Sequence, residues 1–291
     1  MKLSRRDMMI GTAAAFSAGA HAAAAPLTAG AVVERIKAHV GVPWREVTVD
    51  GIVAGDAATP VTGIATTMMA TFDALKVAVA SGKNFIVTHE PTFWSHQENV
   101  SEVKDDPLYL EKLAYIKEHK LVSFHFHDHW HALKPVDGIA VGMMRQLSWE
   151  GYVDPADPHR FILPETTLAG LARHLRDKLG ARTLRVVGQP DMPVERAVAS
   201  WGYCMKAGGL PLINSETDVL IVGETWEWEM VEYVQDLVSA GRRKAMVIVG
   251  HMMSEQAGMK YCAEWLRGFV PEVPVEYLPI VEPYWGVPQN A

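Results

Sequence analysis

The sequence predicts an α/β fold built from duplicated α/β units. Stretches in which apolar residues recur with helical periodicity alternate with short apolar stretches typical of strands. One pattern also occurs twice, over residues 70–90 and 229–251: a helix, a turn with glycine, an apolar strand and then a histidine. Because ligands of open α/β sheets gather at the carboxyl ends of strands, we expect the two histidines, His89 and His251, to converge. The alternative is a coincidence between two common helix-to-strand units.

Each element follows from the period of its apolar residues, about 3.6 in helices and about 2 in strands. The first half should fold, in order, as helix 29–40, strands 47–53 and 60–66, helix 71–81, strand 84–88, helix 107–119, strand 121–126 and helix 136–147. A stretch rich in proline and aspartate, residues 152–159, then interrupts the pattern and marks a boundary. The second half should continue as a strand near Phe161, helix 167–179, strands 184–187, 196–201 and 219–222, helix 226–239, strand 245–249, helix 254–269 and strand 273–278.

These elements divide the mature chain into three parts. We expect an N-terminal α/β lobe over residues 25–150 and a middle α/β segment over residues 151–215. A C-terminal α/β segment over residues 216–291 is expected to complete the functional site.

The composition excludes several classes of protein. Of 291 residues, 49% are hydrophobic and 21% charged, which argues against global disorder. The formal net charge of −7 provides no basic surface for nucleic acid. Two cysteines are too few for a disulfide scaffold or a Cys-rich zinc module, and we expect Cys204 and Cys262 to be separate, buried thiols. The 12 histidines, four of them within residues 125–131, give the first indication of metal chemistry.

Residues 1–24 have the features of a secretory signal peptide. Lys2 and the pair Arg5-Arg6 precede an apolar run too short to span a bilayer, and Ala20-His21-Ala22 fits a cleavage site. The arginine pair favours the twin-arginine route, and a plain Sec signal is the alternative. Since later apolar runs are also short, we expect a soluble periplasmic protein with no stable membrane association.

Three groups of residues carry ligand chemistry. His89 and Glu90 are adjacent at a predicted strand end, where a single histidine is more commonly structural. His125 and His127 would share a face of an extended chain, unless this segment is a solvated His-rich turn. His251 and Glu255 are four residues apart, so one face of a first helical turn can present both, although Glu255 could instead complement the helix dipole.

Taken together, the three groups predict a site for metal ions. Imidazole and carboxylate ligands without thiolate suit Zn, Mn, Fe, Co or Ni. Five ligands, two of them carboxylates, exceed what one zinc ion needs, so two divalent ions per chain are favoured.

These motifs resemble the NIF-three-like family, also catalogued as GTP cyclohydrolase I type 2 homologues. The resemblance extends from about Val33 to Leu278, and its most specific motif is Gly250-His251 through Glu255 before a helix. It implies mixed sheets in two intertwined lobes with a dinuclear metal site between them, and assembly as a toroidal homohexamer. The implied metal ligands are His89, Glu90, His131, His251 and Glu255, with Glu255 bridging the two ions.

The chain departs from the family pattern at two ligand positions. Glu90 stands where the family has histidine, and His131 where it has aspartate. The two exchanges cancel, so three imidazoles and two carboxylates remain.

Two functions are compatible with such a site. The first is a dinuclear metal-dependent hydrolase, cyclohydrolase- or amidohydrolase-like, acting on a small cyclic amide, ester or nucleotide-like substrate. The alternative is a metal-binding or scaffold hexamer without turnover. For the hydrolase, His127 or His129 would relay a proton or support His131. Glu224 ends a predicted strand and either faces the site or has a structural role.

Four tryptophans flank the motifs. They would form an aromatic rim for a flat substrate, or pack in the core. They are Trp94, Trp130, Trp226 and Trp228.

Overall fold

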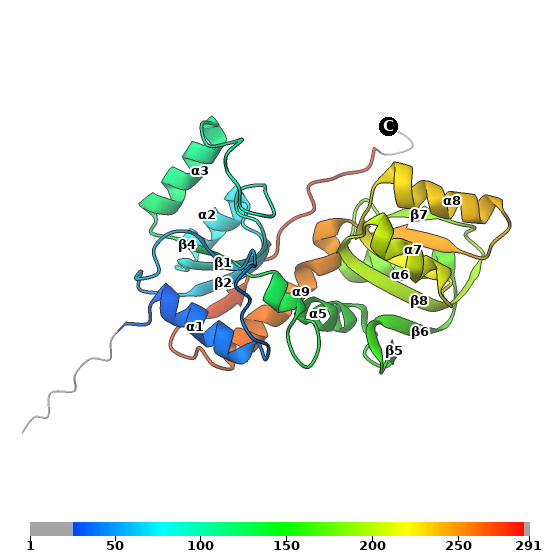
Figure 1. The fold of residues 1–291 in the computed structure, drawn as a ribbon, viewed down its shortest axis with the longest axis horizontal. Helices are drawn as coiled ribbons and strands as arrows, with labels where there is room; N and C mark the ends of the chain where they lie inside the picture. The colour runs from blue at the N-terminus through cyan, green and yellow to red at the C-terminus, as the bar shows by residue number, and fades with distance from the viewer. Residues whose placement is uncertain (1–25, 288–291) are drawn as a thin grey trace, which may run out of the picture.

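The computed structural model describes residues 26–287, and they form a mixed α/β fold with two sheets. The predicted α/β class is therefore confirmed. Figure 1 shows two lobes, each containing one sheet, with α5 (Gly138–Leu147) and α9 (His251–Arg267) between them. The proposed signal segment, residues 1–24, lies outside the described residues.

The first sheet has the strand order β1-β4-β3-β2-β11. Only β1 pairs antiparallel, with β4, and the other neighbours are parallel. Helices α2 and α3 cover one face and α1 and α9 the other, which is why side chains of β2 and β3 alternate between two apolar clusters. The elements are α1 (Ala29–His39), β1 (Gly51–Ala54), β2 (Ile64–Met69), α2 (Phe72–Ala80), β3 (Phe85–Glu90), α3 (Pro107–Glu118), β4 (Val122–His125) and β11 (Val275–Tyr277).

The second sheet has the strand order β5-β6-β8-β9-β10-β7. Strands β8, β9 and β10 are parallel to one another, and the remaining pairs are antiparallel. Helix α6 packs on one face, and α7 and α8 pack on the other. The elements are β5 (Val153–Asp154), β6 (Asp157–Thr167), α6 (Leu168–Leu179), β7 (Arg185–Val187), β8 (Pro193–Tyr203), α7 (Lys206–Asn214), β9 (Val219–Glu224), α8 (Glu232–Ser239) and β10 (Ala245–Ile248).

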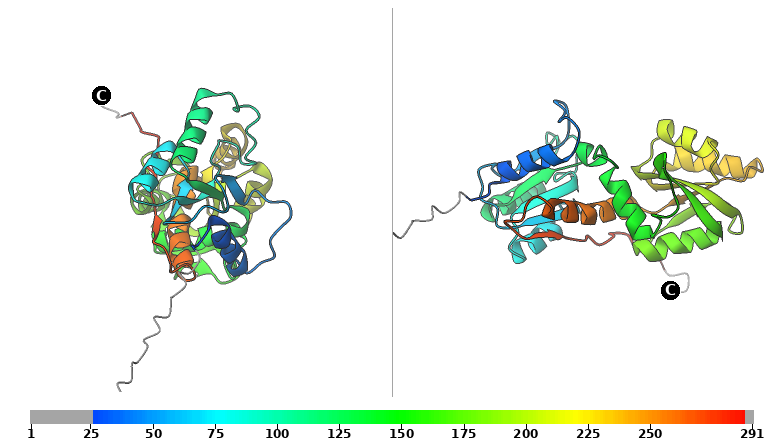
Figure 2. Two further views of the ribbon diagram at one scale, coloured as in Figure 1. Left: turned by 90° about the vertical axis from the view of Figure 1, so that its left-hand side faces the viewer. Right: turned by 90° about the horizontal axis from the view of Figure 1, so that it is seen from below.

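Helices α5 and α9 join the two lobes through a close crossing that depends on a glycine in each helix, Gly142 and Gly258. A Cβ atom on Gly142 would lie 2.3 Å from the Ala257 carbonyl oxygen, and one on Gly258 would lie 2.4 Å from Ile139 Cδ1. After α9 the chain returns to the first lobe, where β11 pairs with β2. Figure 2 shows α9 running between the lobes before this return. The lobes are thus intertwined, and α9 is fixed against both.

Several expected boundaries differ from the structure. Helix α9 starts at His251 instead of residue 254, because Gly250, with φ of +93°, turns the chain directly into the helix. Strand β2 starts at Ile64 instead of residue 60, because the side chain of Asn84 bonds to the backbone of Pro60 and Thr62 in a turn.

Other elements were not expected from the sequence. A short helix, α4 (Asp128–His131), follows β4, a π-helical turn (Glu227–Val231) precedes α8, and α7 was also missed. Residues 152–159 include β5 and the start of β6. The expected division at residue 215 falls between β8 and β9, which pair within one sheet.

Two further observations concern the cysteines and the membrane. Cys204 and Cys262 are both buried and free, so the prediction of two separate thiols is confirmed. Among the described residues, no helix is long and apolar enough to cross a bilayer.

Candidate metal centre

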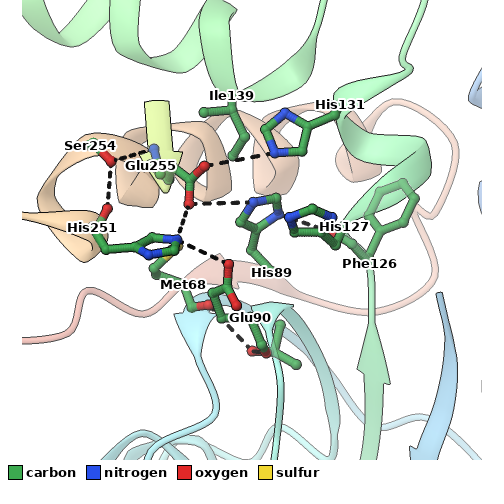
Figure 3. A network of polar contacts seen from close by, with 12 residues as sticks. Met68, His89, Glu90, Phe126, His127, His131, Ile139, His251, Ser254 and Glu255 are labelled. Carbon is green, nitrogen blue, oxygen red and sulfur yellow. Dashed lines mark hydrogen bonds and ion pairs between the residues drawn. The ribbon is translucent and has the colours of Figure 1, made fainter. Parts of the chain in front are cut away.

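The structure brings the five predicted ligand residues together around the carboxylate of Glu255 (Figure 3). Glu255 Oε2 lies 3.1 Å from His251 Nε2 and 3.6 Å from His89 Nε2, and Glu255 Oε1 lies 3.7 Å from His131 Nε2. Glu90 joins the group from the opposite side, with its Oε1 atom 3.1 Å from His251 Nε2. The strand-end histidines converge as expected, while their role as metal ligands stays a prediction.

Backbone geometry orients His89 toward this cluster. His89 is the penultimate residue of β3, and its Nδ1 atom lies 3.2 Å from the Phe126 carbonyl oxygen. Since a carbonyl oxygen only accepts, Nδ1 carries a proton, and Nε2 is the ring nitrogen that faces Glu255. With Nδ1 held in this way, Nε2 is the atom that would bind a metal.

Carboxylates hold the other two imidazoles. His131 Nδ1 donates to Asp137 Oδ2 at 2.9 Å, and the second Asp137 oxygen accepts from the backbone N–H groups at the start of α5. His251 Nδ1 donates to Glu224 Oε1 at 3.0 Å. Such carboxylate–histidine pairs orient metal ligands and raise their basicity. Glu224 thus contacts the cluster through His251, and Asp137 was not singled out by the sequence motifs.

The centre of the cluster has polar atoms that protein groups leave unpaired. His89 Nε2 and Glu255 Oε2 are buried and form no well-directed hydrogen bond, although Oε2 is in ion-pair contact with His251. A buried polar atom without a partner costs free energy, which a cation between these atoms would offset. Ligand atoms of His89, Glu90 and Glu255 lie within 4.8 Å of one another, as do those of His89, His127 and His131. The residues present therefore fit divalent cations bound by imidazole and carboxylate.

The charges of the cluster follow from these contacts. Burial raises the pKa of Glu255, but the neighbouring imidazoles of His89 and His251 outweigh burial and lower it to about 2. Burial lowers the pKa of His131, but Asp137 and Glu255 outweigh burial and raise it to about 9. At neutral pH His131 is protonated in the metal-free chain, so a cation must displace a proton to bind it.

His127 lies inside the cluster with one free nitrogen. Its Nδ1 atom contacts Asp128 Oδ1 at 3.1 Å, so Asp128 engages Nδ1 and leaves Nε2 available. Burial, together with the nearby His89 and His131, lowers the pKa of His127 to about 4. It is therefore a neutral imidazole at physiological pH.

His129, the other expected proton relay, has both ring nitrogens engaged outside the cluster. Nδ1 lies 2.6 Å from Asp50 Oδ2, Nε2 accepts from the Arg45 backbone N–H at 3.0 Å, and the ring stacks on Trp44. The sequence could not separate His127 from His129, because the extended chain ends at His125 and the following residues turn into α4. This geometry leaves His127 as the relay candidate.

The tryptophans divide into core and surface residues. Trp130 is fully buried and packs in the core, so it forms no part of a rim. Trp94, Trp226 and Trp228 are at least half exposed. Trp226 and Trp228 stack with ring centroids 5.0 Å apart, just beyond the strand that ends at Glu224.

Comparisons with known proteins agree with this architecture. A family profile described as Duf34/NIF3 (NGG1p interacting factor 3) matches residues 36–282. No curated protein sequence matches the chain.

Solved structures share the fold at low sequence identity. Hypothetical protein SA1388 of Staphylococcus aureus matches with a TM-score of 0.73 and 14% identity, over 90% of this chain and 100% of that one. A Bacillus cereus protein related to NIF3 matches with a TM-score of 0.69 and 11% identity, over 89% and 99%. A protein of unknown function, ybgI, matches with a TM-score of 0.65 and 18% identity, over 88% and 100%.

Proposed function

Because the chain belongs to the DUF34/NIF3 family, we propose that its imidazole and carboxylate cluster holds two divalent cations and hydrolyses a small substrate. The observation that supports this most is the position of Glu255. One buried carboxylate faces three imidazoles from three different elements, β3, α4 and α9, and its Oε2 atom forms no well-directed hydrogen bond. A carboxylate in this position can bridge two cations, and a pair of cations suits hydrolysis.

The donors surround both oxygens of Glu255. His131 faces Oε1, His89 and His251 face Oε2, and Glu90 contacts His251, so the set can be shared between two ions. Zn, Mn, Fe, Co and Ni all accept this set of ligands. When bound, such a pair supplies Lewis acidity and lowers the pKa of water at the site.

The residues of the chain supply the proton transfer. His127 is neutral at physiological pH, and Asp128 fixes its ring with Nε2 available as an acceptor. We assign His127 as the residue that relays the proton released during hydrolysis, because its low pKa lets it pass a proton on and not retain it. The side chains of His131 and His251 are 29% and 20% exposed, so a substrate can approach the cluster from solvent.

The surface suggests a planar substrate. Trp226 and Trp228 are exposed and follow the strand end that carries Glu224, which contacts His251. Aromatic faces of this kind stack on flat rings, which fits a cyclic amide or nucleotide-like compound. GTP itself is a poor candidate if the chain is exported.

The proposed setting is the periplasm, with export by the twin-arginine route. That route passes folded proteins, so the metal could be loaded before export. We also propose that the chain assembles as a homohexamer, as the family resemblance implies.

The decisive experiment is metal analysis of the purified protein, followed by a panel of small amide, ester and phosphate substrates with and without chelator. We expect about two divalent ions per chain. We also expect turnover that chelation abolishes and that the same metal restores. The variant His127→Ala should keep its metal and lose turnover, whereas His39→Ala, an exposed histidine of α1, should keep both. A metal-loaded protein that turns over no member of the panel would favour the non-catalytic scaffold.

A further inference from the structure

A second group of ligand atoms lies beside the cluster and includes a residue outside the family motifs. Ligand atoms of Glu90, His96 and His127 all lie within 4.8 Å of one another. We propose that these three residues form a separate, weaker site for a divalent cation. The site shares Glu90 with the dinuclear centre proposed above and therefore rests in part on that proposal.

The contacts of these residues converge on one point. His96 Nδ1 lies 3.9 Å from Glu90 Oε2, while Glu90 Oε1 contacts His251. The rings of His96 and His127 are 4.6 Å apart and nearly perpendicular. The two oxygens of Glu90 thus face opposite sides, one toward the dinuclear cluster and one toward His96. The two oxygens of a glutamate at position 90 can each contact a different cation, whereas an imidazole there would offer fewer free ligand atoms.

A buried histidine with unpaired ring nitrogens lies next to this group. His125 is fully buried, and neither of its ring nitrogens has a hydrogen-bond partner. Its ring lies 5.8 Å from that of His96 and 6.2 Å from that of His127. Its nitrogens are not among the grouped ligand atoms, so His125 would lie beside the cation without binding it. Glu98, whose Oε1 lies 3.4 Å from His125 Nδ1, has an unpaired oxygen as well.

The loop that carries His96 is fixed by contacts within it and with α3. Glu98 Oε1 accepts from the Thr92 backbone N–H at 2.8 Å, and the Thr92 carbonyl accepts from the buried Lys112 ammonium at 2.5 Å. These contacts close the loop and hold His96 over Glu90. The side chain of His96 is 45% exposed, so this side of the site is open to solvent. A cation here can therefore exchange readily.

The three ligands indicate which metal the site would bind and how tightly it would bind. Two imidazoles and one carboxylate are a common protein ligand set for zinc with an open position. Binding should be weaker than in the dinuclear centre, because Glu90 is shared and nearby dications repel one another. Occupancy would engage His127 and remove it from proton transfer, so excess zinc should inhibit the proposed reaction.

The test is the number of zinc ions bound per chain, measured by equilibrium dialysis and elemental analysis over rising free zinc. The wild-type protein should bind two tight equivalents and a third, weaker one. His96→Ala should lose the third equivalent and keep the tight pair. His39→Ala, which removes another exposed imidazole, should bind like the wild type.

Three results would overturn the inference: a wild type that saturates at two equivalents, a His96→Ala variant that still binds the third, or a His96→Ala variant that loses the tight pair. The variant His251→Ala distinguishes failure of the proposed third site from failure of the proposed dinuclear centre. It should lose at least one tight equivalent and keep the weak one. If it binds as much tight zinc as the wild type, the dinuclear assignment fails, while zinc binding that depends on His96 still supports the separate site.

Discussion

Gly202 and Glu255 are in direct contact, and the contact depends on the absence of a side chain at position 202. A Cβ atom on Gly202 would lie 2.5 Å from Glu255 Oε1. The Gly202 backbone N–H also donates to Ser254 Oγ at 2.8 Å. Strand β8 of the second lobe therefore supports the carboxylate that faces the histidines of the first lobe.

We predict that Gly202→Ala lowers metal content. The new methyl group would displace the Glu255 carboxylate, and φ of +71° at this position disfavours any residue except glycine. Metal per chain after dialysis measures the effect. Gly208→Ala in α7, where a Cβ meets no atom within 4 Å, is the matched control and should keep its metal. Unchanged metal content in Gly202→Ala would show that the carboxylate tolerates displacement.

A second prediction compares the two carboxylates of the cluster. Glu255→Gln should lose at least one metal per chain and most activity, because Glu255 faces three imidazoles and offsets the repulsion between two cations. Glu90→Gln should keep partial occupancy, because His251 and Glu255 remain beside its position. The test is the metal content per chain of both variants after gentle dialysis. If Glu255→Gln holds two equivalents and Glu90→Gln none, Glu255 is not the bridge.

The third prediction concerns the partner of His131. Asp137→Asn removes the charge that orients the His131 ring, and we expect metal affinity to fall about 10- to 100-fold. The fold should change little, because asparagine can still cap α5. Asp137→Ala should also lose the cap, at about 0.5–2 kcal/mol of stability. Zinc affinity and thermal unfolding separate the two effects. Equal zinc affinity in Asp137→Asn and the wild type would contradict the role of the charge.

The fourth prediction is that metal binding releases protons. The pKa of His131 in the metal-free chain is raised from 6.5 to about 9, so a cation must displace its proton at neutral pH. Calorimetry at pH 7.5 in buffers of different ionisation enthalpy should detect the release. The part due to His131 should decline as the pH rises through 9, whereas the part due to His251, for which burial lowers the pKa but the carboxylate neighbours raise it to about 12, should persist. Zinc affinity should increase over the same window.

The same group affects the stability of the metal-free chain. A raised histidine pKa means that the folded state binds the proton more tightly, so its stabilising contribution is full below pH 6.5 and is lost as the pH rises through 9. The metal-free variant Asp137→Asn should show a smaller loss across this window. A wild-type metal-free chain whose stability is flat from pH 6.5 to 9 would contradict the ion pair between His131 and Asp137.

The sequence by itself determined the fold class and the main positions of the cluster. Apolar periodicity is local, so it located most helices and strands, and it placed His89 and His251 at the ends of two strands. Because carboxyl ends of strands collect ligands, their convergence could be expected. The spacing between His251 and Glu255 fits one helical turn and needed no tertiary information.

Only the tertiary structure decided how the remaining histidines are used. His127 and His129 are two residues apart in one short segment, yet Asp50, distant in the sequence, binds His129 and leaves His127 in the cluster. His96 reaches Glu90 because its loop closes through contacts within it and with α3. Such contacts depend on where separate elements pack. A histidine carries the same side chain in every setting, and its partner carboxylate, burial and free nitrogen are decided only when the elements that surround it pack together.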